Sequence, residues 1–218
     1  MENVRRAVAV EVESPPPELS AVEEAYRRIV EEAAVYVAER GRLEREKREE
    51  LYRRFRELYP WLHSQLIQQA INQGIEVGKS FLEARRDGRV RKPRPEVRRV
   101  STRFAKDSWS YKKAVGSAAP ARLALSLPGG RREVWIKPHR RFWLYWWKAL
   151  RGEAELASTL TVKRRRGRWY AVFVFDVKPK GEPLAEAVAF DVNENSVAVA
   201  RVSLLSTVDR VPAGIGNI

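Results

Sequence analysis

One aspartate near the end of the sequence has the surroundings that most favour chemistry. Asp191 follows an apolar run, and period-two alternation places it on the same face as Ala187 and Ala189. A carboxylate on such a face is costly unless it is paired or bound to a metal ion. Two-metal hydrolysis of phosphodiesters uses strand carboxylates to hold Mg²⁺, so we predict that Asp191 is a catalytic metal ligand. The alternative is that Asp191 opens an Asx-type turn with Asn193.

A basic stretch in the middle of the chain could contact phosphates. Residues 85–106 hold ten Lys and Arg against two acidic residues, and Phe104, Trp109 and Tyr111 provide rings able to stack on unpaired bases. A solvated, extended connector is the alternative, because two X-Pro steps lie within the stretch. The predicted nucleic-acid contacts here and just beyond are Arg89, Arg91, Lys92, Arg94, Arg98, Arg99, Arg103, Lys112 and Lys113.

A second basic cluster lies where a hairpin turn is predicted. Lys163, Arg164, Arg165 and Arg166 precede Gly167, which suits a tight turn. These four residues are candidate phosphate contacts, and an ordinary exposed turn is the alternative. Two lone histidines have no ligand partner at motif spacing, so we expect no metal there.

The elements that must position these residues begin with a short strand and three helices. Residues 8–12 alternate with period two before three prolines. Ser20 is the expected N-cap of a helix that runs to about residue 40, with Glu23 at the third helical position. Further helices are expected over 42–58 and from the residues after Pro60 to about residue 81. Gly74 and Gly78 in the third helix predict close approach of another backbone.

The rest of the chain has the period of β-strands. Hairpins are predicted over 121–136, over 156–177 across Arg166-Gly167, and over 187–202. The aromatic run 142–147 fits either a strand or a short helix, and it is more typical of a core than of a base-stacking surface. Residues 179–184 are expected to form a linker.

The composition favours a polyanion as partner. The 218 residues carry a formal net charge of +14 and a pI near 10.3, with 44% hydrophobic residues for a core. No apolar run approaches the roughly 20 residues of a membrane span and the N-terminus lacks the layout of a secretory signal peptide, so we expect a cytoplasmic protein that does not bind a membrane. The absence of Cys excludes disulfides, thiol catalysis and a Cys-based zinc site.

These parts, in this order, resemble the transposon-encoded OrfB (TnpB) proteins, which are compact RNA-guided DNA endonucleases related to type V CRISPR effectors. The resemblance spans nearly the whole chain. Its segments are the first strand, Leu62–Leu66, Phe81–Arg86, Lys92–Arg94, Gly167–Tyr170 and Ala189–Asn195. The last segment is the most specific, because a strand, Asp-Val-Asn, a turn and a second strand are similar to the first RuvC motif of archaeal members.

The resemblance implies an α+β protein with an OB-like β-barrel (wedge) that holds an inserted helical bundle and is followed by the start of an RNase H-like (RuvC) domain. The implied parts are a first wedge strand in 1–17, a helical recognition insert in 18–90, the barrel in 91–180 and the N-terminal portion of the RuvC domain in 185–218. Asp191 would be the first Mg²⁺-binding carboxylate. Guide RNA and DNA would be the partners.

The sequence departs from the family in the nuclease site. Family members place a catalytic glutamate, a further aspartate and a four-cysteine zinc ribbon downstream, and this chain contains none of them. We therefore expect RNA-guided DNA binding with an incomplete nuclease site that is inactive alone, and a separately encoded C-terminal piece could complete it. The alternatives are a non-enzymatic RNA- or DNA-binding regulator and a general basic nucleic-acid-binding protein.

Overall fold

The protein is described by a computed structural model that covers residues 3–113, 120–178, 186–193 and 196–203. Its contacts divide the chain into two units, 3–178 and 179–218, with residues 1–2 grouped with the second. The larger unit is α+β, with four helices and a nearly closed antiparallel β-barrel. The α+β class, the barrel and the helical segment predicted from the sequence are therefore confirmed.

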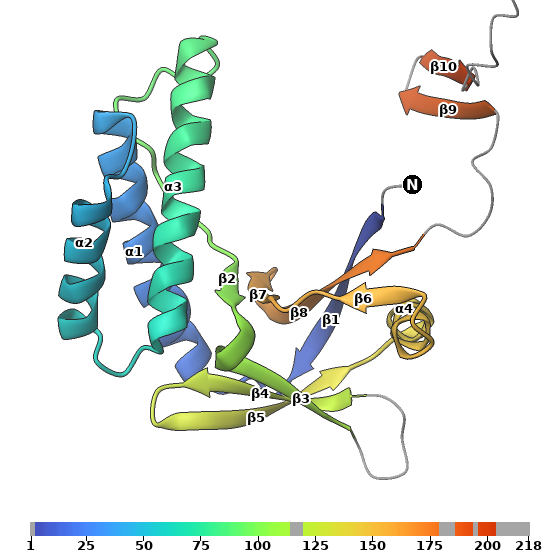
Figure 1. Cartoon of the computed structure of the whole chain (residues 1–218), viewed down its shortest axis with the longest axis horizontal. Helices are drawn as coiled ribbons and strands as arrows, with labels where there is room; N and C mark the ends of the chain where they lie inside the picture. Colours follow the sequence, from blue (N-terminus) through green and yellow to red (C-terminus); the bar gives the residue numbers. More distant parts are fainter. Residues whose placement is uncertain (1–2, 114–119, 179–185, 194–195, 204–218) are drawn as a thin grey trace, which may run out of the picture. The chain divides into compact units, whose positions relative to one another are not determined.

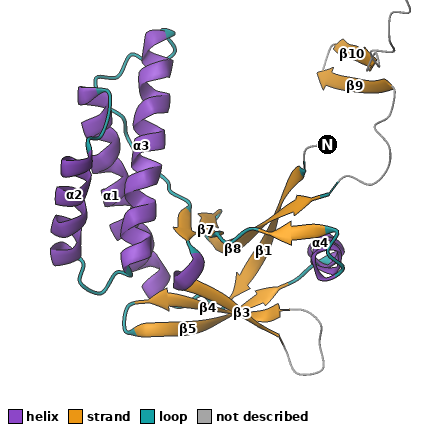
Figure 2. Cartoon of the chain, viewed as in Figure 1, coloured by secondary structure: helices purple, strands orange, loops and turns teal. Residues whose placement is uncertain are grey.

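Three helices form a bundle on one side of the larger unit (Figures 1 and 2). They are α1 (Glu18–Arg40), α2 (Arg45–Leu58) and α3 (Ser64–Arg86). Apolar residues at helical spacing, such as Val22, Ile29 and Ala33 on α1, are buried, as expected for amphipathic helices. The bundle and the barrel share one hydrophobic core.

The start of α1 differs from the prediction. Ser20 lies inside the first turn, whereas Pro17 occupies the N-cap position and makes no side-chain capping bond. The predicted N-cap at Ser20 was therefore wrong. Pro17 has φ near −60°, which suits a helix start, and proline lacks an N–H that would otherwise need a partner there.

Gly74 and Gly78 let α3 pack directly on α1, as predicted. A Cβ atom on Gly74 would lie 2.5 Å from the Ala33 Cβ and 2.7 Å from the Val30 carbonyl oxygen. A Cβ on Gly78 would lie 2.6 Å from the Val37 Cβ. The cost of glycine in a helix, about 1 kcal/mol each, is offset by this close backbone contact.

The barrel consists of eight strands in the order β2-β7-β8-β1-β5-β4-β3, with β6 paired to β8. The first strand, β1, lies at the centre of this order, between β8 and β5. The three-helix bundle follows β1 in the sequence and precedes all the other barrel strands. The strands are β1 (Val4–Glu13), β2 (Thr102–Phe104), β3 (Trp109–Lys113), β4 (Pro120–Leu127), β5 (Gly130–Lys137), β6 (Ala154–Leu156), β7 (Leu160–Arg165) and β8 (Arg168–Val177). The two predicted hairpins correspond to β4–β5 and β7–β8.

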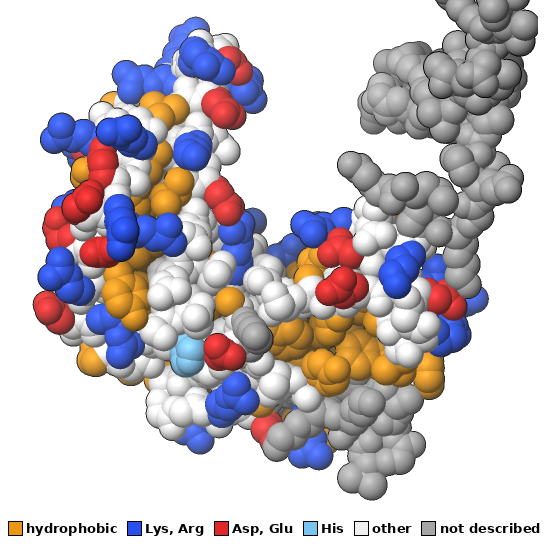
Figure 3. All heavy atoms as spheres, in the orientation of Figure 1, with side chains coloured by type: hydrophobic (Ala, Val, Ile, Leu, Met, Phe, Trp, Pro, Cys, Tyr) orange, Lys and Arg blue, Asp and Glu red, His pale blue; other side chains and the backbone are white. Residues whose placement is uncertain are grey.

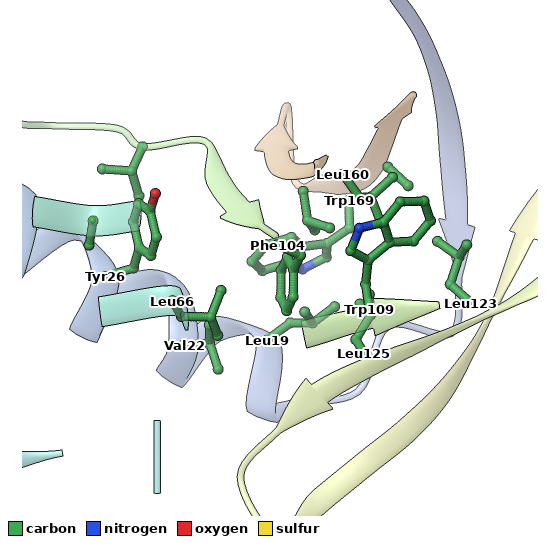
Figure 4. Close-up of a cluster of buried hydrophobic side chains, with 14 of the residues drawn as sticks. Leu19, Val22, Tyr26, Leu66, Phe104, Trp109, Leu123, Leu125, Leu160 and Trp169 are labelled. Carbon is green, nitrogen blue, oxygen red and sulfur yellow. The ribbon is translucent and has the colours of Figure 1, made fainter. Parts of the chain in front are cut away.

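The barrel interior continues into the bundle. Figure 4 shows Leu19 of α1, Phe104 of β2 and Leu160 of β7 within one cluster of buried side chains. The indole nitrogen of Trp109 donates a hydrogen bond of 2.8 Å to the Ser158 carbonyl, so the polar atom of this buried ring has a partner. This shared core fixes the first turns of α1 against the end of the β7–β8 hairpin.

The aromatic run is a helix, α4 (Arg140–Leu150). Phe142 and Trp146 are buried one turn apart with their rings stacked, and Phe142 meets Phe173 of β8 edge to face at 5.0 Å. The opposite side exposes Leu144 and Trp147.

The second unit contains one described hairpin. Its strands are β9 (Glu186–Asn193) and β10 (Ser196–Ser203), paired antiparallel as predicted. Among the described residues, no helix is both long and apolar enough to cross a membrane.

Candidate nucleic-acid interface

A pocket of about 530 Å³ brings together two basic segments that are far apart in the sequence. It lies between the first turns of α1, the connector after α3 and the β7–β8 turn. We call it the arginine pocket, and its lining residues are Ser20, Glu23, Glu24, Arg27, Arg98, Arg99, Val100, Arg164, Arg166 and Gly167.

The hairpin turn sets the position of two of these arginines. Arg165 and Arg168 are the last paired residues, and Arg166 and Gly167 both have positive φ, 49° and 80°. Two left-handed residues are what a type I′ hairpin turn requires. Because side chains alternate along β7, Arg164 lies on the pocket side while Lys163 and Arg165 lie on the other face.

The connector is held in place by apolar anchors. Val97 and Val100 are buried, and Arg98 and Arg99 stand exposed between them. The backbone N–H of Val97 donates to Glu31, and Arg27 donates to the Val97 carbonyl at 3.2 Å. This part of the basic stretch is therefore anchored to α1, with Arg98 and Arg99 exposed to solvent.

The arginines of the pocket fall into two groups. Arg27 is paired with Glu24 and Glu31, and Arg98 is paired with Glu96. Arg99, Arg164 and Arg166, in contrast, have no carboxylate within 4.0 Å among the residues that the structure describes. Three guanidinium groups are thus available to a ligand.

Two carboxylates from α1, Glu23 and Glu24, line the arginine pocket and reduce its positive charge. Hydrogen bonds from Arg27 and Arg28 lower the pKa of Glu24 to about 2, so its charge is neutralised within the protein. Burial raises the pKa of Glu23 above its ordinary value, while the nearby charge of Arg164 opposes this shift. Glu23 is therefore the one carboxylate of the pocket whose charge would oppose a bound anion.

Most other predicted contacts in the basic stretch are paired with carboxylates. Arg89 binds Asp87, Lys92 binds Glu96, Arg94 binds Glu39 and Arg103 binds Glu76. Arg91 is exposed. Figure 3 shows the same mixture on one face, where Asp and Glu side chains lie among the Lys and Arg of the bundle. Surface pairs of this kind exchange with solvent easily, so they weaken a phosphate contact without preventing it.

Three predicted site residues have side chains outside the described residues. The backbones of Lys112 and Lys113 lie at the end of β3. The backbone of Asp191 lies in β9, opposite Ala198 of β10, and the Asx-turn alternative involves the turn after it, which is also outside the described residues. No group of three or more His, Cys, Asp or Glu that could hold a metal ion occurs in the described part of the chain.

Sequence reasoning did not find the α1 side of the pocket. Ser20 and Glu23 were assigned only to helix capping, and Arg27 was not singled out. No local pattern links these residues to the basic segments, because the contact is made by the fold.

The fold and the pocket define an α+β protein with an arginine-lined pocket of about 530 Å³ between a helical bundle and a barrel. Residues 22–115 match the model of the Uncharacterized protein MJ0013 family, which covers less than half of the chain. That stretch contains most of α1, all of α2 and α3, the connector with Arg98 and Arg99, and β2 and β3, but not the β7–β8 hairpin. Among curated proteins, none matches the sequence.

Proposed function

We propose that this protein binds nucleic acid and that the arginine pocket holds backbone phosphate. The observation that carries the proposal is the convergence of Arg99, Arg164 and Arg166, which have no ion-pair partner in the described residues, on one pocket. A guanidinium group presents a planar set of donors that matches phosphate oxygens. The net charge of +14 adds long-range attraction to a polyanion.

We further propose that the protein is OrfB-like. In this proposal the barrel is the OB-like wedge, the bundle inserted after β1 is the recognition part, and β9–β10 begins an RNase H-like (RuvC) domain. The segment Ala189–Asn195 and the order of the parts support it. Guide RNA and DNA would then be the ligands of the basic surface.

The described hairpin does not by itself fit a two-metal Mg²⁺ site. The strand paired with β9, Ser196–Ser203, contains no carboxylate. β9 itself contains two carboxylate residues, Glu186 and Asp191, which are five positions apart in the sequence. Two-metal hydrolysis needs several carboxylates around the ions. We therefore propose binding, not cleavage, as the activity of this chain.

The proposal is tested by binding of fluorescein-labelled RNA and DNA oligonucleotides, measured by fluorescence anisotropy over a range of salt concentrations. The test variant combines Arg99→Ala, Arg164→Ala and Arg166→Ala. The matched control combines Arg40→Ala, Arg53→Ala and Arg141→Ala, which removes the same charge from exposed helix positions outside the arginine pocket and the basic stretch.

We expect the test variant to bind more weakly and to lower the slope of log affinity against log salt by about 2, or about 0.7 for each lost single-strand phosphate contact. The control should change the slope by much less. Equal losses in both variants would contradict a defined pocket and favour a general basic nucleic-acid-binding protein. In the same assay, unlabelled random RNA and DNA are added as competitors. A general basic nucleic-acid-binding protein would bind these competitors as tightly as it binds the labelled probe.

A further inference from the structure

A second pocket adjoins the arginine pocket at the tip of the β7–β8 hairpin. Gly167 lines both pockets. The second pocket has a volume of about 440 Å³ and lies against the ends of β1, β5 and β8. We call it the indole pocket, and its lining residues are Glu11, Val12, Glu13, Ser14, Pro15, Trp135, Lys137, Gly167, Arg168 and Trp169.

The charges of the indole pocket are balanced internally. Arg168 pairs with Glu11 at 3.5 Å, and Lys137 pairs with Glu13 at 3.1 Å. Two cations and two carboxylates leave no net charge to attract a phosphate. This pocket therefore differs in kind from its neighbour, where three arginines are unpaired in the described residues.

Trp135 is the feature that gives the indole pocket a binding surface. Its neighbours Val134 and Ile136 are buried in the barrel, whereas Trp135 points outward and is 48% exposed. The guanidinium of Arg122 lies over its ring at 4.8 Å, and Arg122 is itself paired with Glu133 at 3.0 Å. An arginine held over one side of the indole orients the ring and leaves it partly open to a ligand.

Because Gly167 lines both pockets, a single nucleic-acid strand could reach from one pocket to the other. Gly167 has no side chain, and a Cβ built on it would meet nothing within 4 Å. A nucleic-acid backbone could therefore pass over the turn between a phosphate in one pocket and a base in the other. Bases within a duplex are stacked on each other and cannot present their faces in this way, whereas unpaired bases can.

We propose that Trp135 stacks on an unpaired base of the same strand whose phosphate binds in the arginine pocket, so that the ligand of this surface is single-stranded nucleic acid. The inference rests on the proposed phosphate contact and adds the strandedness of the ligand. Stacking on an aromatic ring tolerates any base, so the preference concerns single strands and not sequence.

The test uses the whole chain and fluorescein-labelled probes of about 12 nucleotides, a length within the site sizes of single-strand binders. The probes are oligouridine, oligothymidine, a duplex of the same length, and an abasic strand that keeps the phosphates and lacks the bases. The variants are Trp135→Ala and Trp135→Phe, which retains a ring. Trp147→Ala is the matched control, because Trp147 is 44% exposed and lies on α4, outside both pockets.

We expect Trp135→Ala to weaken binding of both single-stranded base-containing probes by about tenfold, within the range of one base–aromatic stack. Trp135→Phe should retain most of the affinity. Binding of the duplex and of the abasic strand should be unchanged in all three variants, and Trp147→Ala should behave as the unaltered protein. RNA and DNA are distinguished by comparing oligouridine with oligothymidine.

The two proposals fail in different ways. If the triple arginine variant binds less tightly while Trp135→Ala matches Trp147→Ala, phosphate binding stands and the base contact is overturned. The base contact is also overturned if Trp135→Ala weakens binding of the abasic strand as much as binding of the base-containing probes, because that loss of affinity cannot come from stacking. If the arginine variant binds every probe as the unaltered protein does, the proposed function itself fails. Thermal unfolding of each variant shows that its fold is retained.

Discussion

Arg103 on β2 donates two hydrogen bonds to the carboxylate of Glu76 on α3, with N···O distances of 2.8 and 2.6 Å. The pair joins the helical bundle to one end of the strand order of the barrel. Arg103 is mostly covered, whereas Glu76 is 58% exposed. Arg103 therefore helps to hold the bundle on the barrel, and this structural role is separate from its predicted contact with nucleic acid.

Replacing Arg103 by Leu should destabilise the protein and affect binding less than Arg99→Ala does. We expect a loss of about 0.5–1 kcal/mol at neutral pH, because solvent screens the exposed end of the pair. Urea denaturation measures this loss. Hydrogen bonds from Arg103 lower the pKa of Glu76, so the stabilisation is present above the ordinary carboxyl pKa and is lost as the pH falls through the lowered value. A difference between variant and unaltered protein that does not shrink in acid would contradict this assignment.

Replacing Arg166 by Asn should separate the stability of the hairpin from the binding of phosphate. Asn tolerates the left-handed conformation that Arg166 adopts with φ near 49°, and Asn-Gly is a preferred type I′ turn pair. We expect the melting temperature to be maintained or raised by a degree or two, consistent with a few tenths of a kcal/mol. Oligonucleotide affinity should fall several-fold, as expected for one lost phosphate contact. If the Arg166→Asn variant is as stable as the unaltered protein and binds oligonucleotides with the same affinity, Arg166 does not contact phosphate.

Replacing Glu23 by Gln should strengthen oligonucleotide binding at neutral pH. Its carboxylate lies in the arginine pocket, and removing one negative charge should raise the affinity by about fivefold, the order of one unit charge under near-aqueous screening. Burial raises the pKa of Glu23, so the folded state is favoured by protonation, and this stabilisation is lost as the pH rises through the folded pKa.

The difference between Glu23→Gln and the unaltered protein should therefore vanish at pH values below that pKa. Anisotropy measured across the acidic range checks this trend. Glu83→Gln on the exposed side of α3 is the matched control and should leave affinity unchanged at every pH.

Replacing Asp191 by Ala should leave oligonucleotide affinity within about twofold, because the proposed binding surface lies in residues 3–178. We also expect the purified chain to show no Mg²⁺-dependent DNA cleavage. Incubation of the chain and a supplied guide-type RNA with labelled DNA and Mg²⁺, followed by gel electrophoresis, tests this. Cleavage that disappears in Asp191→Ala would contradict the expectation of inactivity and identify Asp191 as a working metal ligand.

Local features of the fold were predictable because their causes are local. Period-two runs predicted β1, β4, β8 and the β9–β10 hairpin, and Arg166-Gly167 predicted the turn between β7 and β8. The aromatic run gave no decision between strand and helix, because residues on every side of it are apolar. Burial of Phe142 against Phe173 of β8 and of Trp146 against Tyr111 of β3 decides for the helix.

The candidate site required the tertiary structure. The sequence by itself determined that the chain is strongly basic, that it has two arginine-rich segments, and that a helical stretch follows its first strand. The fold alone decided that Arg99 and Arg164 line one pocket and that Arg103 is held by Glu76. The reason is that pairing and pocket formation depend on contacts between residues distant in the chain, which no local pattern of residue types encodes.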